Sequence, residues 1–150
     1  RVGGGKTASR LSALEAALMS AIVDLGLGIV KQALVGAVEE SILPLSDHHS
    51  RLNLPSGTSV AEGSHWMLLE QGDVPGKTAR IELKPFASQD HLQAYLDREK
   101  PDLVVGTHPQ QASHGFHDSL NAAAVTEFLG RPLGGRLALI IERNLLLIQK

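Results

Sequence analysis

The chain has 150 residues, of which 43% are hydrophobic and 20% charged, and it contains no cysteine. This length fits a single domain, and the absence of cysteine excludes disulfides, thiolate metal ligands and a thiol nucleophile. The formal net charge of −2, without a run of lysine or arginine, argues against nucleic acid as a partner. The most apolar segment, 16–23, is far shorter than the roughly 20 residues of a membrane span, so we expect no membrane partner. The absence of cysteine fits a reducing compartment, and we expect a cytoplasmic protein.

Residues 1–10 are predicted to form a flexible N-terminus. They include Gly5-Lys6-Thr7, which resembles the last three positions of a phosphate-binding P-loop. The first glycine of that motif and the strand before it would lie upstream of Arg1, so the resemblance covers three residues. A glycine-rich lead into a helix is the favoured interpretation.

Apolar residues at helical spacing predict a long N-terminal helix over 11–43. The first set runs from Leu11 to Ile29, and Val30, Leu34 and Val38 continue the period. Gly26 and Gly28 weaken helix propensity by about 1 kcal/mol each, so we expect a broken helix or a closely packed one there. We expect the sheet of the same domain to cover the wide apolar surface of this helix; the alternative is that a second copy of the chain covers it.

A long loop is predicted over 45–64, and it carries Asp47, His48 and His49. This tripeptide resembles the signature of the DHH phosphoesterases. That family also needs aspartates on earlier strands, whereas the only upstream aspartate is Asp24, inside a helical pattern. We therefore assign no family, and a solvated loop is the favoured interpretation of the tripeptide.

Two strands are predicted over 65–71 and 78–84, joined as an antiparallel hairpin by the turn-forming sequence GDVPGK. Apolar and charged residues alternate in the second strand, which indicates that one of its faces is exposed to solvent, as expected near a sheet edge. Trp66, the only tryptophan, is expected to pack in the core.

The remaining chain predicts alternating helices and strands. We expect a helix over 88–100 capped by Ser88, a buried strand over 102–106, a helix over 119–129, a strand over 136–141, and a segment 145–148 that extends or follows it. This order implies parallel crossovers. The predicted fold is a single α/β domain over 1–150, with a mixed sheet of four or five strands and helices packed on it.

A histidine-rich loop lies between the strand over 102–106 and the next helix. Open α/β sheets bind ligands at the carboxyl ends of their strands, so His108, His114 and His117 stand at an expected site position. His114 and His117 are three residues apart beside Asp118, a spacing that allows both imidazoles to bind one ion. The structural alternative is an exposed loop in which Asp118 simply caps the helix.

The sequence thus supports two hypotheses about function. The first is a small enzyme of hydrolase or lyase type acting on a polar small molecule, with His108, His114 and Asp118 as catalytic residues. A divalent metal such as zinc, held by His114 and His117 with His48 and His49, would activate a water molecule. The second is a non-catalytic ligand-binding or regulatory domain that self-associates as a homo-oligomer through residues 11–43.

Overall fold

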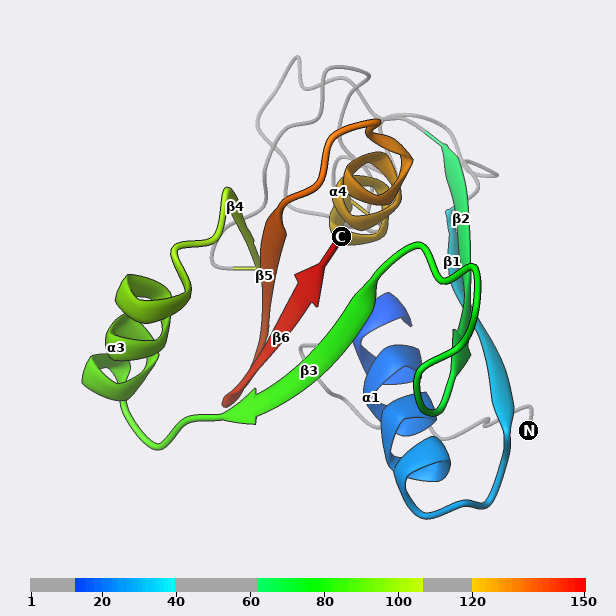
Figure 1. The fold of residues 1–150 in the computed structure, drawn as a ribbon, viewed down its shortest axis with the longest axis horizontal. Helices are drawn as coiled ribbons and strands as arrows, with labels where there is room; N and C mark the ends of the chain where they lie inside the picture. The colour runs from blue at the N-terminus through cyan, green and yellow to red at the C-terminus, as the bar shows by residue number, and fades with distance from the viewer. Residues whose placement is uncertain (1–12, 40–61, 107–119) are drawn as a thin grey trace, which may run out of the picture.

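The computed structural model describes residues 13–39, 62–106 and 120–150 (Figure 1). These ranges contain a four-stranded sheet of order β3-β6-β5-β4 and a two-stranded sheet that pairs β1 with β2. The predicted mixture of helices with a mixed four-stranded sheet is confirmed. The elements follow one another as α1 (Ala13–Gly26), β1 (Gln32–Glu39), β2 (Gly63–Glu70), β3 (Arg80–Pro85), α3 (Gln89–Glu99), β4 (Leu103–Val105), α4 (Leu120–Gly130), β5 (Arg136–Ile141) and β6 (Asn144–Gln149).

The four-stranded sheet combines one parallel pair with two antiparallel pairs. β4 and β5 are parallel neighbours joined through α4, as the predicted crossover requires. β6 turns back antiparallel to β5 and then pairs antiparallel with β3. Glu142, with a φ of 53°, provides the left-handed backbone that the tight β5–β6 turn needs. β6 therefore separates β3 from the parallel pair.

The prediction that the helix continues to residue 43 is wrong beyond Gly26. α1 ends at Gly26, the backbone at Gly28 is left-handed with a φ of 70°, and residues 32–39 form strand β1. Val30, Leu34 and Val38 are four residues apart, a step that fits one face of a helix and also one side of a strand. Val35 and Ala37 are buried while Leu34 and Val38 are exposed, so the period here is two.

The predicted hairpin between the next two strands is also wrong, although both strands exist. β2 pairs with β1 along its full length, and β3 pairs with β6 in the other sheet. The connecting segment 71–79 is thus a crossing between sheets and not a tight turn. The expected edge position of β3 is confirmed by the strand order.

A large core fills the space between the two sheets. Figure 1 shows α1 and α4 between the four-stranded sheet and the β1–β2 pair, with α3 on the opposite side of the four-stranded sheet. Buried side chains of this core come from every layer, among them Leu14, Leu18, Val35, Met67, Val125, Leu137, Leu139 and Ile148. A smaller core lies under α3, where Leu92 packs with Ala138, Leu145 and Leu147. β5 and β6 are consequently covered on both faces.

The described helices are short. α3 matches its prediction closely: Ser88 Oγ accepts from the backbone N–H of His91, and Lys100 ends the helix in a left-handed conformation before Pro101. α1 has 14 residues and α4 has 11. Within 13–39, 62–106 and 120–150, no helix combines the length and the apolar composition needed to cross a membrane.

Candidate functional site

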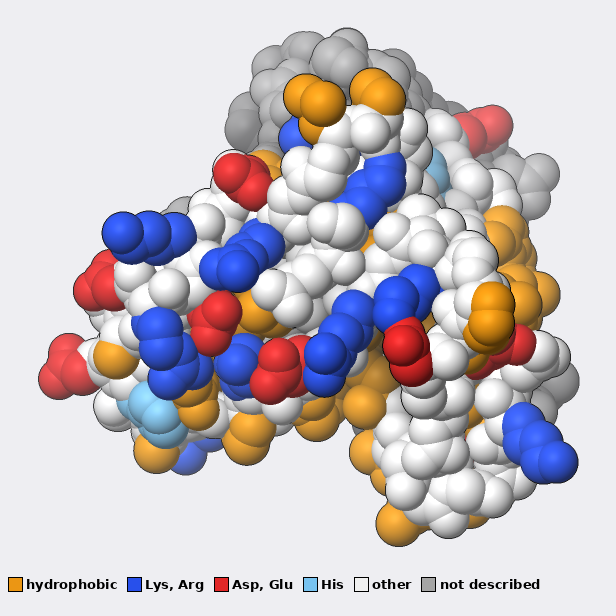
Figure 2. Space-filling view, in the orientation of Figure 1, with side chains coloured by type: hydrophobic (Ala, Val, Ile, Leu, Met, Phe, Trp, Pro, Cys, Tyr) orange, Lys and Arg blue, Asp and Glu red, His pale blue; other side chains and the backbone are white. Residues whose placement is uncertain are grey.

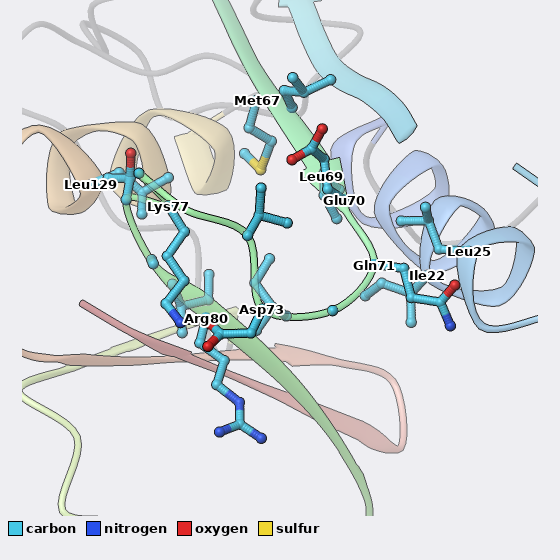
Figure 3. Close-up of a pocket in the computed structure, with 18 of the residues that line it drawn as sticks. Ile22, Leu25, Met67, Leu69, Glu70, Gln71, Asp73, Lys77, Arg80 and Leu129 are labelled. Carbon is cyan, nitrogen blue, oxygen red and sulfur yellow. Dashed lines mark hydrogen bonds and ion pairs between the residues drawn. The ribbon is translucent and has the colours of Figure 1, made fainter. Parts of the chain in front are cut away.

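A groove of about 980 Å³ opens where the core between the two sheets reaches the surface. It is bounded by the second half of α1, by β2 and β3, by α4, and by the connecting segment 71–79 (Figure 3). The groove exists because β2 and β3 belong to different sheets, so the chain between them has to span the gap.

The floor of the groove is apolar and comes from five elements. Alternation along β2 turns Met67 and Leu69 inward, and both are buried. Ile22 and Leu25, one turn apart on α1, line the side facing them. Further apolar lining comes from Ile81, Val125, Leu129 and Ile148.

The rim of the groove is polar and is formed by segment 71–79. Lys77 and Asp73 form an ion pair there, and the backbone N–H of Lys77 donates to the carbonyl of Val74 over 3.3 Å. Gly72 and Gly76 have φ values of 90° and 76°, the left-handed backbone that glycine adopts without strain. Arg80 borders the groove, but Figure 3 shows its guanidinium pointing away from the cavity.

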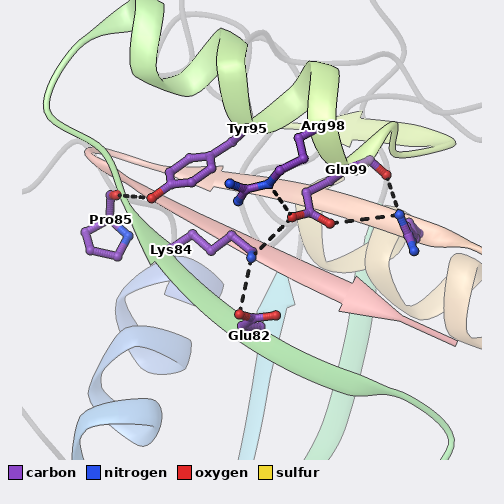
Figure 4. Close-up of polar contacts among 7 residues, drawn as sticks. Glu82, Lys84, Pro85, Tyr95, Arg98 and Glu99 are labelled. Carbon is purple, nitrogen blue, oxygen red and sulfur yellow. Dashed lines mark hydrogen bonds and ion pairs between the residues drawn. The ribbon is translucent and has the colours of Figure 1, made fainter.

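An ion-pair cluster lies away from the groove and joins β3 to α3 (Figure 4). Lys84 Nζ lies 3.2 Å from Glu82 Oε1 and 3.3 Å from Glu99 Oε1, and Arg98 Nε donates to Glu99 Oε1 over 3.1 Å. The Tyr95 hydroxyl donates to the carbonyl of Pro85 over 3.3 Å. This cluster ties an edge strand to the helix that covers it.

The cluster shifts the pKa of both of its central groups. The hydrogen bond from Arg98 lowers the pKa of Glu99 below 4.5; partial burial opposes this shift, and the ion pair with Lys84 supports it. Burial by itself lowers the pKa of Lys84, but the hydrogen bonds and charges of Glu82 and Glu99 outweigh it, so the net pKa is raised above 10.5. Both groups are therefore charged at neutral pH, which fits a structural role.

The structure describes the two elements that flank the predicted histidine loop, β4 and α4, whereas the loop lies outside the described residues. β4 ends at Val105, and α4 begins at Leu120. Gly106 follows β4 with a φ of 101°, and a Cβ there would overlap the carbonyl oxygen of Ile140 on β5. The chain thus leaves β4 through a position that only glycine fills without strain.

A buried carboxylate contacts the first turn of α4. Glu15 of α1 is only 5% exposed, and its Oε1 accepts from the side-chain amide of Asn121 in the first turn of α4. Its second oxygen, Oε2, is buried without a hydrogen-bond partner among the described residues. Since Asn121 follows Asp118 by three residues, a polar contact inside the core stands beside the entry of the loop into α4.

One histidine within the described strands also faces α4. His65 Nδ1 lies 3.0 Å from Thr126 Oγ1, and that hydroxyl donates to the carbonyl of Ala122 over 3.0 Å. The contact joins β2 to α4.

The predicted site residues all lie outside the described residues. These are His108, His114, His117 and Asp118 in one segment, Asp47, His48 and His49 in another, and Gly5-Lys6-Thr7 near the N-terminus. Their proximity stays a prediction. Inside the described ranges, no group of three or more histidine and carboxylate side chains is placed to hold a metal ion.

The groove was missed because GDVPGK has the composition of a tight turn, and a turn encloses no cavity. The one usable signal in the sequence is the alternation of Met67 and Leu69 with their neighbours. It indicates which side of the strand faces the core, but it does not indicate that a groove lies beside that side.

Comparisons with models of protein families, with curated proteins and with solved structures found no match to this chain.

Proposed function

We propose that this chain is a ligand-binding domain whose groove holds a small molecule with an apolar body and a neutral polar end. The observation that supports this most is the groove itself, whose floor is formed by apolar side chains of the core. Its volume of about 980 Å³ lies within the range of roughly 300–1,000 Å³ that is typical of ligand pockets.

The floor selects the apolar body of the ligand. Ile22, Leu25, Met67 and Leu69 approach the space from two sides and offer neither hydrogen bonds nor charge. Each methylene that leaves water for such a surface contributes about 0.8 kcal/mol, which is roughly a fourfold gain in affinity. A ligand without an apolar body would leave the floor in contact with water and would not gain this binding free energy.

The rim selects the polar end. Lys77 and Asp73 together offer donors and acceptors with no net charge. An exposed pair of this kind stabilises the free protein by about 1 kcal/mol or less, so either partner can turn to a ligand. A hydroxyl or an amide suits it better than a carboxylate or an ammonium group.

Isothermal titration with 1-alkanols from hexanol to decanol tests the proposal. We expect the affinity to rise roughly three- to fivefold per methylene, as burial in an apolar groove requires. Ala79→Trp places an indole ring in the groove and is expected to abolish binding, whereas Ala94→Trp on the exposed side of α3 should bind normally. Affinity independent of chain length, or equal loss in both variants, would refute a groove site.

The hydrolase or lyase hypothesis is a second candidate, supported by the buried Glu15–Asn121 contact. Glu15 Oε2 has no hydrogen-bond partner among the described residues, and a carboxylate near the end of a loop with three histidines is suited to orient an imidazole. In this candidate His108, His114 and Asp118 act on the substrate, and His114, His117, His48 and His49 hold a metal such as zinc.

Elemental analysis tests this second candidate. Protein purified without chelators or a histidine tag should contain a stoichiometric metal that His114→Ala removes. Its thermal midpoint should also rise with zinc, manganese, nickel or magnesium. Metal-free protein with an unchanged midpoint would argue against the metal-assisted mechanism.

A further inference from the structure

The side of the β1–β2 pair that faces away from α1 and α4 is apolar and exposed. We call it the outer face and define it by Leu34, Val38, Trp66 and Leu68, which are between 53% and 68% exposed. The expectation that Trp66 packs in the core is therefore wrong. Figure 2 shows hydrophobic side chains gathered along the edge of the molecule where Figure 1 places β1 and β2.

The orientation of the β1–β2 pair does not explain why the outer face is apolar, because both sides of the pair carry apolar side chains. Its opposite side already carries the buried Val35, Ala37, Met67 and Leu69, which pack on the core. Turning the pair over would expose those residues instead. A two-stranded sheet with apolar side chains on both sides is expected where both sides have something to cover them.

Trp66 is held flat on the outer face. Gly36 is its register partner, and a Cβ at Gly36 would overlap the indole ring, so the ring lies across the place where a side chain would stand. The indole Nε1–H donates to Ser64 Oγ over 2.7 Å on the same strand. The ring can therefore be covered by an apolar surface without leaving an unsatisfied donor.

We propose that the outer face is the contact between two copies of this chain. If each of its four side chains offered the roughly 150–250 Å² of an aromatic side chain, the face would expose roughly 350–600 Å², which is an upper estimate because Leu and Val are smaller. On the same basis, Leu27 and Ile29, which are 71% and 66% exposed in the turn before β1, raise this upper estimate to roughly 550–950 Å². A standard interface buries about 800 Å² on each partner.

The charge of the outer face suits a second copy. A two-fold contact sets a patch against itself, so a patch with net charge in its centre would repel its partner. The centre is formed by the neighbouring Leu34 and Leu68 and by Trp66 over Gly36, all neutral. Glu70 stands at one end, where its carboxylate accepts from the side-chain amide of Gln32.

This assignment also changes the predicted route of self-association. The apolar residues Leu14, Leu18, Ala21 and Leu25 of α1 are buried in the core of their own domain. Among the described residues of this range, the large apolar side chains most exposed to a partner lie in the turn before β1 and on the outer side of β1.

The test measures mass and tryptophan fluorescence over a range of concentrations of the full chain. We expect a dimer by sedimentation equilibrium, and a blue shift of the emission of Trp66, the only tryptophan, as the dimer forms. Leu68→Glu and Leu34→Glu should each raise the dimer Kd by roughly 30-fold or more. Leu133→Glu, at a leucine that is 79% exposed outside this face, should leave it unchanged.

Three results would overturn the proposal. One is a monomer at every concentration with the emission of an exposed tryptophan. Another is a dimer that Leu68→Glu and Leu34→Glu do not weaken, with folding of both variants verified by circular dichroism. The third is a monomer whose Trp66 emission is already that of a buried ring, since another part of the same chain would then cover the face.

Discussion

At the scale of single residues, glycines decide where the chain can turn. The sequence around Gly106 predicts a turn after a buried strand, and the structure adds the reason for glycine at this position. Its φ of 101° and its approach to the Ile140 carbonyl both exclude a side chain. Such a contact between neighbouring strands depends on the sheet order, so the sequence alone could not reveal it.

Gly106→Ala is accordingly expected to destabilise the fold by about 1–3 kcal/mol, the usual cost of a strained backbone position. Urea unfolding measures this as a lower midpoint with an unchanged slope. Gly130→Ala is the matched control, because Gly130 has an ordinary φ and no atom near the place of a Cβ. A loss of stability in both variants, or in neither, would contradict this role for Gly106.

At the scale of elements, the sequence predicts a helix or strand correctly where its cap, its apolar spacing and its terminating residue all indicate the same element. Ser88, the stripe of Leu92 and Leu96, and Pro101 all indicate the same helix, and α3 forms there. The second half of the N-terminal pattern lacked such agreement, since a step of four residues suits a strand as well as a helix. The partner of each strand depends on contacts between distant segments, which explains why β2 and β3 were predicted correctly but paired wrongly.

The link between α3 and β3 predicts a pH dependence of stability. The pKa of Glu99 is lower in the folded chain than its ordinary value of 4.5. The ionised carboxylate of Glu99 therefore stabilises the fold fully above pH 4.5, and this stabilisation is lost as the pH falls through the pKa of the folded state. Glu99→Gln should lower the free energy of unfolding by about 1–2 kcal/mol at pH 7. The difference from the unmodified protein should shrink as the pH is lowered below 4.5.

Denaturant unfolding at a series of pH values checks this expectation. Glu127→Gln serves as the control, because Glu127 is an exposed carboxylate on α4 outside the cluster. A constant difference between Glu99→Gln and the unmodified protein from pH 7 to pH 3 would show that the charge of Glu99 does not stabilise the contact.

At the scale of the whole molecule, the groove and the outer face follow from one feature of the fold. Because β1 and β2 form a sheet of their own, the chain crosses to β3 over an open part of the core, and the far side of the pair faces solvent. The histidine cluster, by contrast, was suggested by residue types within one loop. Composition and periodicity can reveal such a loop, but a groove lined by five elements emerges only from their packing.

The most direct test of the groove uses the two methionines of the chain, Met19 and Met67. Met67 lines the groove, whereas Met19 lies on α1 outside it. In protein carrying ¹³C-methyl methionine, titration with 1-octanol should move the Met67 methyl resonance in a saturable manner and leave that of Met19 nearly unchanged. A Met67 resonance that does not move at saturating alcohol, or equal shifts at both methionines, would contradict the proposed ligand site.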